Sequence, residues 1–274
     1  MAEASISFNT TKANAQKAVL SPPDWLRIWR KHFHGQRWGF VAFRAACFGG
    51  DNDNDRWTRF QEQFKRIIEI PFARAVTQAQ EEGVSLPDDF DEARAKFEIQ
   101  WVEVVPVNGE TLTMIADADS LRAKYAALRP NLDPGLCWDV FLCASPEAVE
   151  SFENEASTTD ETSSFWRDRA PFLLAVSAHS DSGLEEDHEE TAWFKPVFKI
   201  AAEVLVESLF TILNIGTPLR RITRSVLQAT ELDQSVEQRQ QQSVEEIRKL
   251  DEIWWSMHPS PARLRMRRNI GSIQ

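Results

Sequence analysis

The chain has 274 residues, a length that fits one enlarged domain or a core with appendages. Apolar residues make up 42% and aromatic residues 10%, which is enough for a substantial core and excludes a wholly disordered chain. The net charge of -11 excludes general binding of the whole chain to nucleic acid or anionic membranes, and leaves open a local basic patch.

The sequence indicates a protein of the cytoplasm, with the nucleus as the alternative. Residues 1–23 are small and polar and contain no apolar segment of the kind found in secretory signals. No run of about 18 apolar residues is present to cross a membrane. The cysteines Cys47, Cys137 and Cys143 are too scattered for a disulfide framework, and the last two are expected to be core thiols instead of metal ligands.

The first part of the chain alternates between predicted strands and helices. After a flexible leader over residues 1–21, the pattern predicts a short amphipathic helix over residues 25–33. Residues 38–48 are apolar and aromatic, as in a buried strand. Large apolar side chains then recur at helical spacing from Trp57 onward, and Pro71 is expected to break this helix.

The next predicted elements complete a βαββαβ order of strands and helices. Strands are predicted over residues 97–105 and 111–116, joined by the hairpin dipeptide Asn108-Gly109, and a helix over 117–128 precedes a strand over 138–143. This order predicts an α+β fold with a ferredoxin-like βαββαβ core and helices packed on one face of the sheet.

The remaining chain is expected to add a strand and helices to this core. Residues 171–178 resemble a further strand, and residues 197–213 are apolar nearly all round, as in a helix that is buried or covered by a partner. We expect a core domain over residues 22–216 and a helical C-terminal extension with a basic tail over 217–274.

Arg44 is the first candidate ligand-binding residue, because it lies inside an otherwise apolar strand. A buried guanidinium must find a carboxylate or another acceptor. Pairing with Glu98 or Glu103 on a neighbouring strand is the favoured interpretation, and binding of an anionic ligand is the alternative.

His179 and Asp181 are the candidate catalytic residues. With Ser177 they alternate at the end of a predicted strand and could share one face, where histidine and carboxylate can act as an acid–base pair or bind a metal. An ordinary solvated acidic loop is the favoured interpretation.

No metal or cofactor is expected. An EF-hand-type count places Asp51, Asp53, Asp55 and Glu62 at ligand positions, but Arg56 stands where the turn normally requires glycine. A solvated turn that caps the following helix is therefore favoured over a calcium loop. The sequence contains no phosphate-binding glycine loop and none of the common hydrolase or zinc motifs.

Basic residues gather in the C-terminal extension, where they could bind tRNA or an acidic partner, or clamp the protein's own acidic body. The candidate ligand-binding residues there are Arg220, Arg221 and Arg224, with Arg263, Arg265, Arg267 and Arg268 in the tail.

The segments GQRWGFVAFR, DRWTRFQEQF, FLCASPEAVESF and AWFKPVFKI resemble a large family of filamentous-ascomycete proteins of unknown function. The resemblance spans roughly residues 35–213 and transfers Trp38, Gly39, Arg44 and Trp57 as fold positions only. Fungal specialised-metabolism clusters contain orphan enzymes of similar size, including tRNA-dependent makers of arginine cyclodipeptides.

Two functions follow as hypotheses. The favoured one is a fungal interaction protein that associates with itself or with a protein partner through its C-terminal helices, which carry the adjacent Trp254 and Trp255. The alternative is a specialised-metabolism enzyme acting on a small molecule or an aminoacyl-tRNA, with Arg44 holding an anionic group and His179 with Asp181 transferring protons.

Overall fold

The computed structural model describes residues 18–45, 53–104, 118–153, 170–185, 188–224, 226 and 253–254. Several expectations fall outside these residues. They are the hairpin at Asn108-Gly109 with its returning strand, most of the leader, Cys47, Asp51, Trp255 and the four tail arginines.

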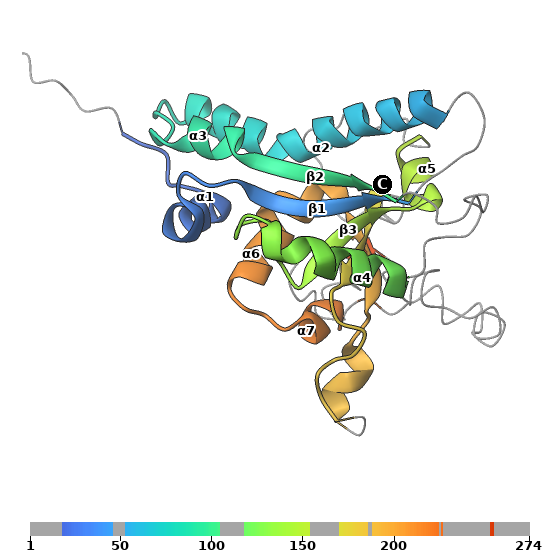
Figure 1. Cartoon of the computed structure of the whole chain (residues 1–274). Coiled ribbons are helices and arrows are strands. Elements are labelled where there is room, and N and C mark those ends of the chain that lie inside the picture. The colour runs from blue at the N-terminus through green and yellow to red at the C-terminus, as the bar shows by residue number, and fades with distance from the viewer. Residues whose placement is uncertain are drawn as a thin grey trace, which may run out of the picture.

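A six-stranded sheet forms the centre of the described structure, in the order β2-β1-β3-β4-β5-β6 (Figure 1). Its strands are β1 (Trp38–Arg44), β2 (Phe97–Glu103), β3 (Val140–Ala144), β4 (Phe172–Ser177), β5 (Val197–Ala201) and β6 (Ile253–Trp254). β1 is parallel to both β2 and β3, β4 is antiparallel to β3 and β5, and β6 is parallel to β5. Every strand except β4 therefore runs in one direction within the described residues.

The mixed α+β content is confirmed, but the ferredoxin-like core is not. A split βαβ unit of that core places another strand between two strands joined by a helix. Here β1 and β2 are direct parallel neighbours from the Trp38–Phe97 pair to the Arg44–Glu103 pair. The long helix between them provides the crossover that adjacent parallel strands require.

That helix, α2 (Asp53–Glu81), runs through Pro71 and is not broken by it. The expectation was wrong because apolar positions continue on both sides of the proline. Phe64 and Ile68 are buried before it, and Phe72 and Ala75 are buried after it. Packing of this stripe outweighs the cost of an interior proline, which loses one hydrogen bond and crowds the preceding turn at a cost of about 3 kcal/mol.

Helices cover both faces of the sheet, in contrast to the single covered face that was expected (Figure 1). Trp38 contacts Trp25, Phe72 and Phe210 on one face. On the other, Phe141 of β3 stacks on Tyr125 with centroids 4.7 Å apart. The helices that provide these contacts are α1 (Asp24–Ile28), α2 and α6 (Phe210–Asn214) on the first face, and α4 (Ala118–Leu128) on the second.

The shorter helical elements complete the two layers. The first face also carries the π-helical turn Trp29–Phe33 and α3 (Phe90–Ala95), whose residues Phe33 and Phe90 contact Phe210 and Trp25. α5 (Pro146–Glu153) packs on α2, where Phe152 meets Phe60 and Phe64. The 3-10 turns are Arg129–Asn131, Glu189–Trp193 and Ala202–Val204, and α7 (Leu219–Thr223) follows α6.

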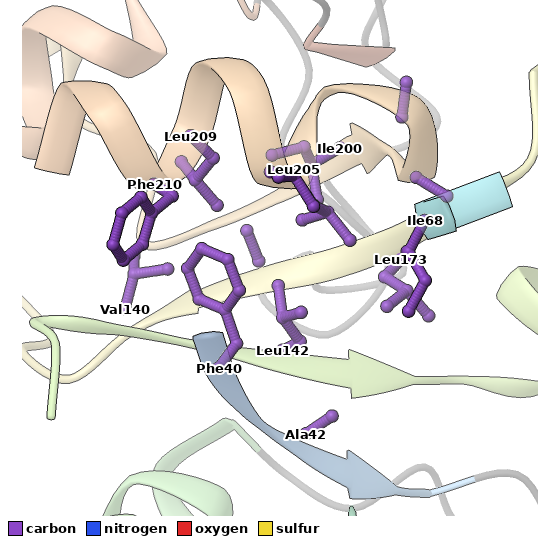
Figure 2. Packing of buried hydrophobic residues seen from close by; sticks show 14 of the residues in the cluster. Phe40, Ala42, Ile68, Val140, Leu142, Leu173, Ile200, Leu205, Leu209 and Phe210 are labelled. Atoms are coloured by element: carbon purple, nitrogen blue, oxygen red, sulfur yellow. The ribbon is translucent and has the colours of Figure 1, made fainter. Parts of the chain in front are cut away.

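The apolar segment over residues 197–213 is a strand followed by helical turns, not one helix. After β5, the 3-10 turn leads into the π-helical turn Leu205–Leu209 and then α6. Figure 2 shows Ile200, Leu205 and Phe210 packed with residues of β1, β3 and β4. An apolar pattern on all sides fits a central strand as well as a buried helix, so periodicity alone could not separate them.

Candidate functional site

The carboxyl ends of β1 and β3 form a topological switch point. The chain leaves β1 through α2 and returns as β2, the neighbour of β1 on one side in the sheet. It then leaves β2 through α4 and returns as β3, the neighbour of β1 on the other side. Open α/β sheets bind ligands outside the carboxyl ends of their parallel strands at such a point. β1 ends there in Arg44, which pairs with Ala144 at the end of β3.

Arg44 is held at this edge by three side chains. Its Nη2 lies 2.5 Å from Asp53 Oδ2, and its Nη1 lies 3.0 Å from Glu103 Oε1. The guanidinium carbon lies 4.7 Å from the centroid of the Trp57 ring, within the range of a cation–π contact. The expected pairing of Arg44 with Glu103 is therefore present, and the side chain is only 11% exposed.

Glu98, the other expected partner, binds Arg37 at the opposite end of β1. Arg37 Nη1 lies 3.1 Å from Glu98 Oε2, and its Nε lies 2.5 Å from Asp133 Oδ2. Each end of β1 thus carries an arginine between two carboxylates. The two differ in burial, because the Arg37 side chain is 50% exposed.

Two further features lie at the carboxyl edge. The hydroxyl of Ser145, directly after β3, accepts a hydrogen bond of 3.1 Å from the backbone N–H of Ala148 and so caps α5. Lys199 of β5 lies 2.6 Å from Glu147 Oε1, with its ammonium 4.8 Å from the Phe172 ring centroid. Arg44 and Lys199 are therefore both paired with carboxylates.

The structure does not bring His179 and Asp181 together with Arg44. β4 runs antiparallel, so its end at Ser177 pairs with Val140 at the start of β3. By the register of β1 with β3, Ser177 lies four residues from Arg44 along the strands, about 13 Å at the usual strand rise, and His179 lies beyond it. Arg44 therefore does not share one site with His179 and Asp181.

His179 contacts Asp139 and not Asp181. Its Nε2 lies 3.7 Å from Asp139 Oδ1, with both side chains more than half exposed. Asp181 Oδ1 instead accepts a hydrogen bond of 2.9 Å from the backbone N–H of Gly183, which closes a local turn. Sequence reasoning missed Asp139, although the pairing of β3 with an antiparallel β4 would have placed it beside His179.

Two more side chains join Asp139 and His179 at the amino edge of the parallel strands. Arg129 Nη2 donates to Asp139 Oδ1 at 2.9 Å, and Arg129 Nε donates to Cys137 Sγ at 3.3 Å. We call these four residues the amino-edge cluster. Cys137 is half-buried, so the core position expected for it is not what the structure shows.

Cys143 does lie in the core, as expected. It is fully buried in β3, and burial raises the pKa of its thiol to about 12. Nearby, burial raises the pKa of Tyr125 to about 12, and its hydroxyl is fixed between the backbone N–H and the carbonyl of Trp138 at 3.0 and 2.7 Å.

The three described candidate arginines of the C-terminal extension contact the chain itself. Arg220 Nε and Arg221 Nη2 lie 2.6 and 3.1 Å from the two oxygens of Glu190, and both arginines hold the pKa of that carboxyl below its usual range. The Arg224 guanidinium lies 3.9 Å from the Trp193 ring centroid. These contacts favour an internal clamp over a basic surface for nucleic acid.

Metal binding finds no support in the described residues. No cluster of three or more histidine, cysteine or carboxylate side chains there is arranged to hold an ion. Asp53 pairs with Arg44, and Asp55 and Glu62 lie within α2, so a twelve-residue calcium loop over this stretch is ruled out. The described part of the chain also has no helix that is long and apolar enough to span a membrane.

Comparisons with protein-family models, curated proteins and solved structures found no significant match to this chain.

Proposed function

We propose that the protein binds a small anionic molecule at the carboxyl edge of β1 and β3, with Arg44 as the residue that contacts it. One difference in exposure carries this proposal. Glu103 is 69% exposed whereas Arg44 is 11% exposed, so one partner of the arginine lies largely in solvent while the guanidinium is largely buried.

A ligand can replace Glu103 on Arg44 at small cost. Ion pairs with an exposed member contribute about 0.2–1 kcal/mol, whereas a carboxylate or phosphate on a preorganised guanidinium forms a stronger, charge-assisted bond. Asp53 and Trp57 would continue to hold Arg44 during this exchange, because they contact Nη2 and the face of the guanidinium. The ligand would therefore bind through Nη1.

Part of the surface that suggested docking of a protein partner is buried, whereas Trp255 and most of the C-terminal extension lie outside the described residues. Trp254 is 1% exposed, and its strand β6 is hydrogen-bonded to β5. The segment over residues 197–213 is largely buried in the chain's own core. The enzymatic alternative required Arg44 and His179 in one site, but these residues lie at opposite edges of the sheet. Binding of a small anion, such as a carboxylate or phosphate ester of fungal metabolism, is the function that these contacts support best.

Native mass spectrometry of gently purified protein from a fungal host tests the proposal first. We expect a retained anionic small molecule, which would then be titrated into apo protein by calorimetry. Arg44→Met should abolish binding. The matched control is Arg37→Met, which removes an arginine from the same kind of double ion pair at the other end of β1 and should leave binding unchanged.

Glu103→Gln provides the sharper test. This variant removes the carboxylate that competes with the ligand, so we expect tighter binding, an effect that general destabilisation cannot produce. The proposal fails if no carboxylate or phosphate ester binds, if Arg37→Met weakens binding as much as Arg44→Met, or if Glu103→Gln weakens it.

A further inference from the structure

We propose that two copies of this chain associate through β2, by antiparallel pairing of their β2 strands about a two-fold axis at Gln100. β2 is the outer strand of the sheet, and within the described residues it pairs with β1 on one side only. This surface is separate from the C-terminal helices that suggested self-association in the sequence. The inference does not depend on the binding of an anion at Arg44.

Four residues of β2 direct their backbone N–H and C=O groups away from β1. At one end of the ladder, the N–H of Trp38 donates to the carbonyl of Lys96 at 3.1 Å. At the other end, the N–H of Val104 donates to the carbonyl of Arg44 at 3.4 Å. Bonding residues alternate along a parallel strand, so the even-numbered residues of β2 face β1. The outward residues are Phe97, Ile99, Trp101 and Glu103.

These outward backbone groups are available to a further strand. No hydrogen bond from the described part of the chain reaches the N–H or C=O groups of the four outward residues. A row of such groups is a template for pairing with another strand. Addition of a strand to an open sheet edge is a common mode of association between proteins.

β2 also lacks the features that usually keep a strand edge from pairing, which are lysine, proline, bulges and unpaired charges. The strand contains neither lysine nor proline, and its register with β1 runs without a bulge over all seven residues. Its two acidic side chains bind arginines at the two ends of β1, Glu98 with Arg37 and Glu103 with Arg44. The negative charge of β2 is therefore offset from the β1 side.

A pair centred on Gln100 fits the hydrogen-bonding pattern of this edge. In an antiparallel ladder, positions that exchange both backbone bonds alternate with positions that exchange none. Centring on Gln100 places outward residues of the two copies opposite each other along the whole strand, because Ile99 faces Trp101 and Phe97 faces Glu103. Moving the centre to Ile99 or Trp101 would leave two residues of each strand beyond the paired length.

The side chains that this register brings together identify a second copy as the occupant. Both acidic residues of β2 face apolar residues of the other copy, Val102 and Phe97, so no like charges lie directly opposite. Ile99 and Trp101 face each other twice, and contacts of aromatic with β-branched side chains stabilise cross-strand pairs. Both residues are half-buried, which leaves part of each side chain accessible to a partner.

The mass of the full-length protein, measured by sedimentation and light scattering over a range of concentrations, tests the proposal first. We expect a dimer of twice the 31.4 kDa mass of one chain. In the dimer, the outward amides of Ile99 and Trp101 should exchange slowly with deuterium. Their exchange should become fast when the protein is diluted to the monomer.

Gln100→Cys tests the register. The two copies of this position face each other at a site without backbone bonds, where Cα atoms lie about 4.5 Å apart, a distance that a disulfide can bridge. Mild oxidation should therefore link two chains, and peptide mass spectrometry should locate the bridge. Val102→Cys is the matched control, because Val102 is also half-buried and lies on the same face of the sheet. Its counterpart in the second copy is about 14 Å away along the strands.

Ile99→Pro tests the hydrogen bonds at the edge. The N–H of Ile99 points away from β1, so proline there removes a donor from the open edge and leaves the ladder with β1 intact. The variant should fold, as judged by circular dichroism, and should have the mass of one chain. Ile99→Val keeps the donor and should remain a dimer.

The proposal is overturned if the native chain has the mass of one chain at every concentration. In such a monomer, slow exchange at Ile99 and Trp101 would show that another part of the chain covers the edge, and fast exchange would show that the edge stays open. It is equally overturned if a folded Ile99→Pro remains dimeric, or if Gln100→Cys forms the bridge no faster than Val102→Cys. If Ile99→Pro does not fold, the comparison of the two cysteine variants decides.

Discussion

The indole ring of Trp25 lies parallel to that of Trp38, with the ring centroids 5.4 Å apart and the planes inclined by 9°. Trp25 belongs to α1 and Trp38 begins β1, and both are buried. Phe72 of α2 and Phe90 of α3 approach the Trp25 ring at 5.0 and 5.5 Å. This cluster fixes three helices to the amino end of β1.

Trp25→Ala should lower the free energy of unfolding by about 3–5 kcal/mol, because truncation of a buried tryptophan loses transfer energy and leaves a cavity. Urea denaturation followed by circular dichroism measures this. Ile215→Ala is the control, since Ile215 is 60% exposed and its truncation should change stability by no more than about 0.5 kcal/mol. A loss below about 1 kcal/mol for Trp25→Ala would show that the cluster is not what holds α1.

Gly39→Ala should prevent stable folding. Gly39 has a φ of 135° within β1, and an added Cβ would lie directly on the carbonyl oxygen of Glu98 in β2. Because the added Cβ would meet backbone atoms of Glu98, no side-chain rotation relieves the overlap.

Gly35→Ala is the matched control for Gly39→Ala. Its φ is also positive, at 75°, but an added Cβ there meets nothing within 4 Å. It should cost only about 1–2 kcal/mol, the usual penalty for a left-handed backbone. Equal melting temperatures for the two variants would contradict the role of close strand approach at Gly39.

The sequence predicted elements whose patterns are local. The apolar run from Trp38 to Phe43, the helical stripe from Trp57 and the strand predicted over residues 171–178 all appear in the structure. The predictions that were wrong concern features that depend on packing against residues distant in the sequence. Pro71 stays helical because the stripe packs on both sides of it.

The same distinction between local patterns and long-range contacts applies to the candidate site. The Arg44–Glu103 pair could be predicted, because a charge inside an apolar strand requires a partner on a neighbouring strand. The contact between His179 and Asp139 could not, because it exists only if β4 runs antiparallel to β3. The contact between Arg129 and Cys137 had no sequence signal, since nothing in their spacing distinguishes a half-buried thiol from a core one.

Acid should destabilise the protein in part through Asp89. Its two oxygens accept hydrogen bonds from Nε and Nη2 of Arg30, and this contact holds the pKa of Asp89 below its usual value. The unfolded state, with the ordinary pKa near 3.9, therefore binds a proton first as the pH falls. The stabilisation is complete above about pH 5 and is lost as the pH falls through the lowered pKa of the folded state.

Asp89→Asn should reduce stability at pH 7 by about 1 kcal/mol or less, the usual contribution of a partly exposed pair, and make the loss of stability below pH 5 less steep. Urea unfolding at several values between pH 2.5 and pH 7 measures both effects. Asp24→Asn removes an exposed carboxylate that pairs with Arg27 and should leave the slope unchanged. An unchanged slope for Asp89→Asn as well would show that this pair contributes nothing to the acid sensitivity.

Pro71→Ala should stabilise the protein by about 1 kcal/mol. An interior proline costs a helix about 3 kcal/mol relative to alanine, and loss of two buried ring methylenes removes about 1.6 kcal/mol. The variant restores a backbone N–H that can donate to the carbonyl of Ile67, and it keeps the rest of the buried stripe of α2. Thermal and urea unfolding measure the change, with Ala75→Gly as a helix variant of opposite expected sign. A fall in stability for Pro71→Ala would mean that the proline gives α2 the course that places Phe72 against Trp25. In that case, the packing energy lost on straightening the helix exceeds the energy of the restored hydrogen bond.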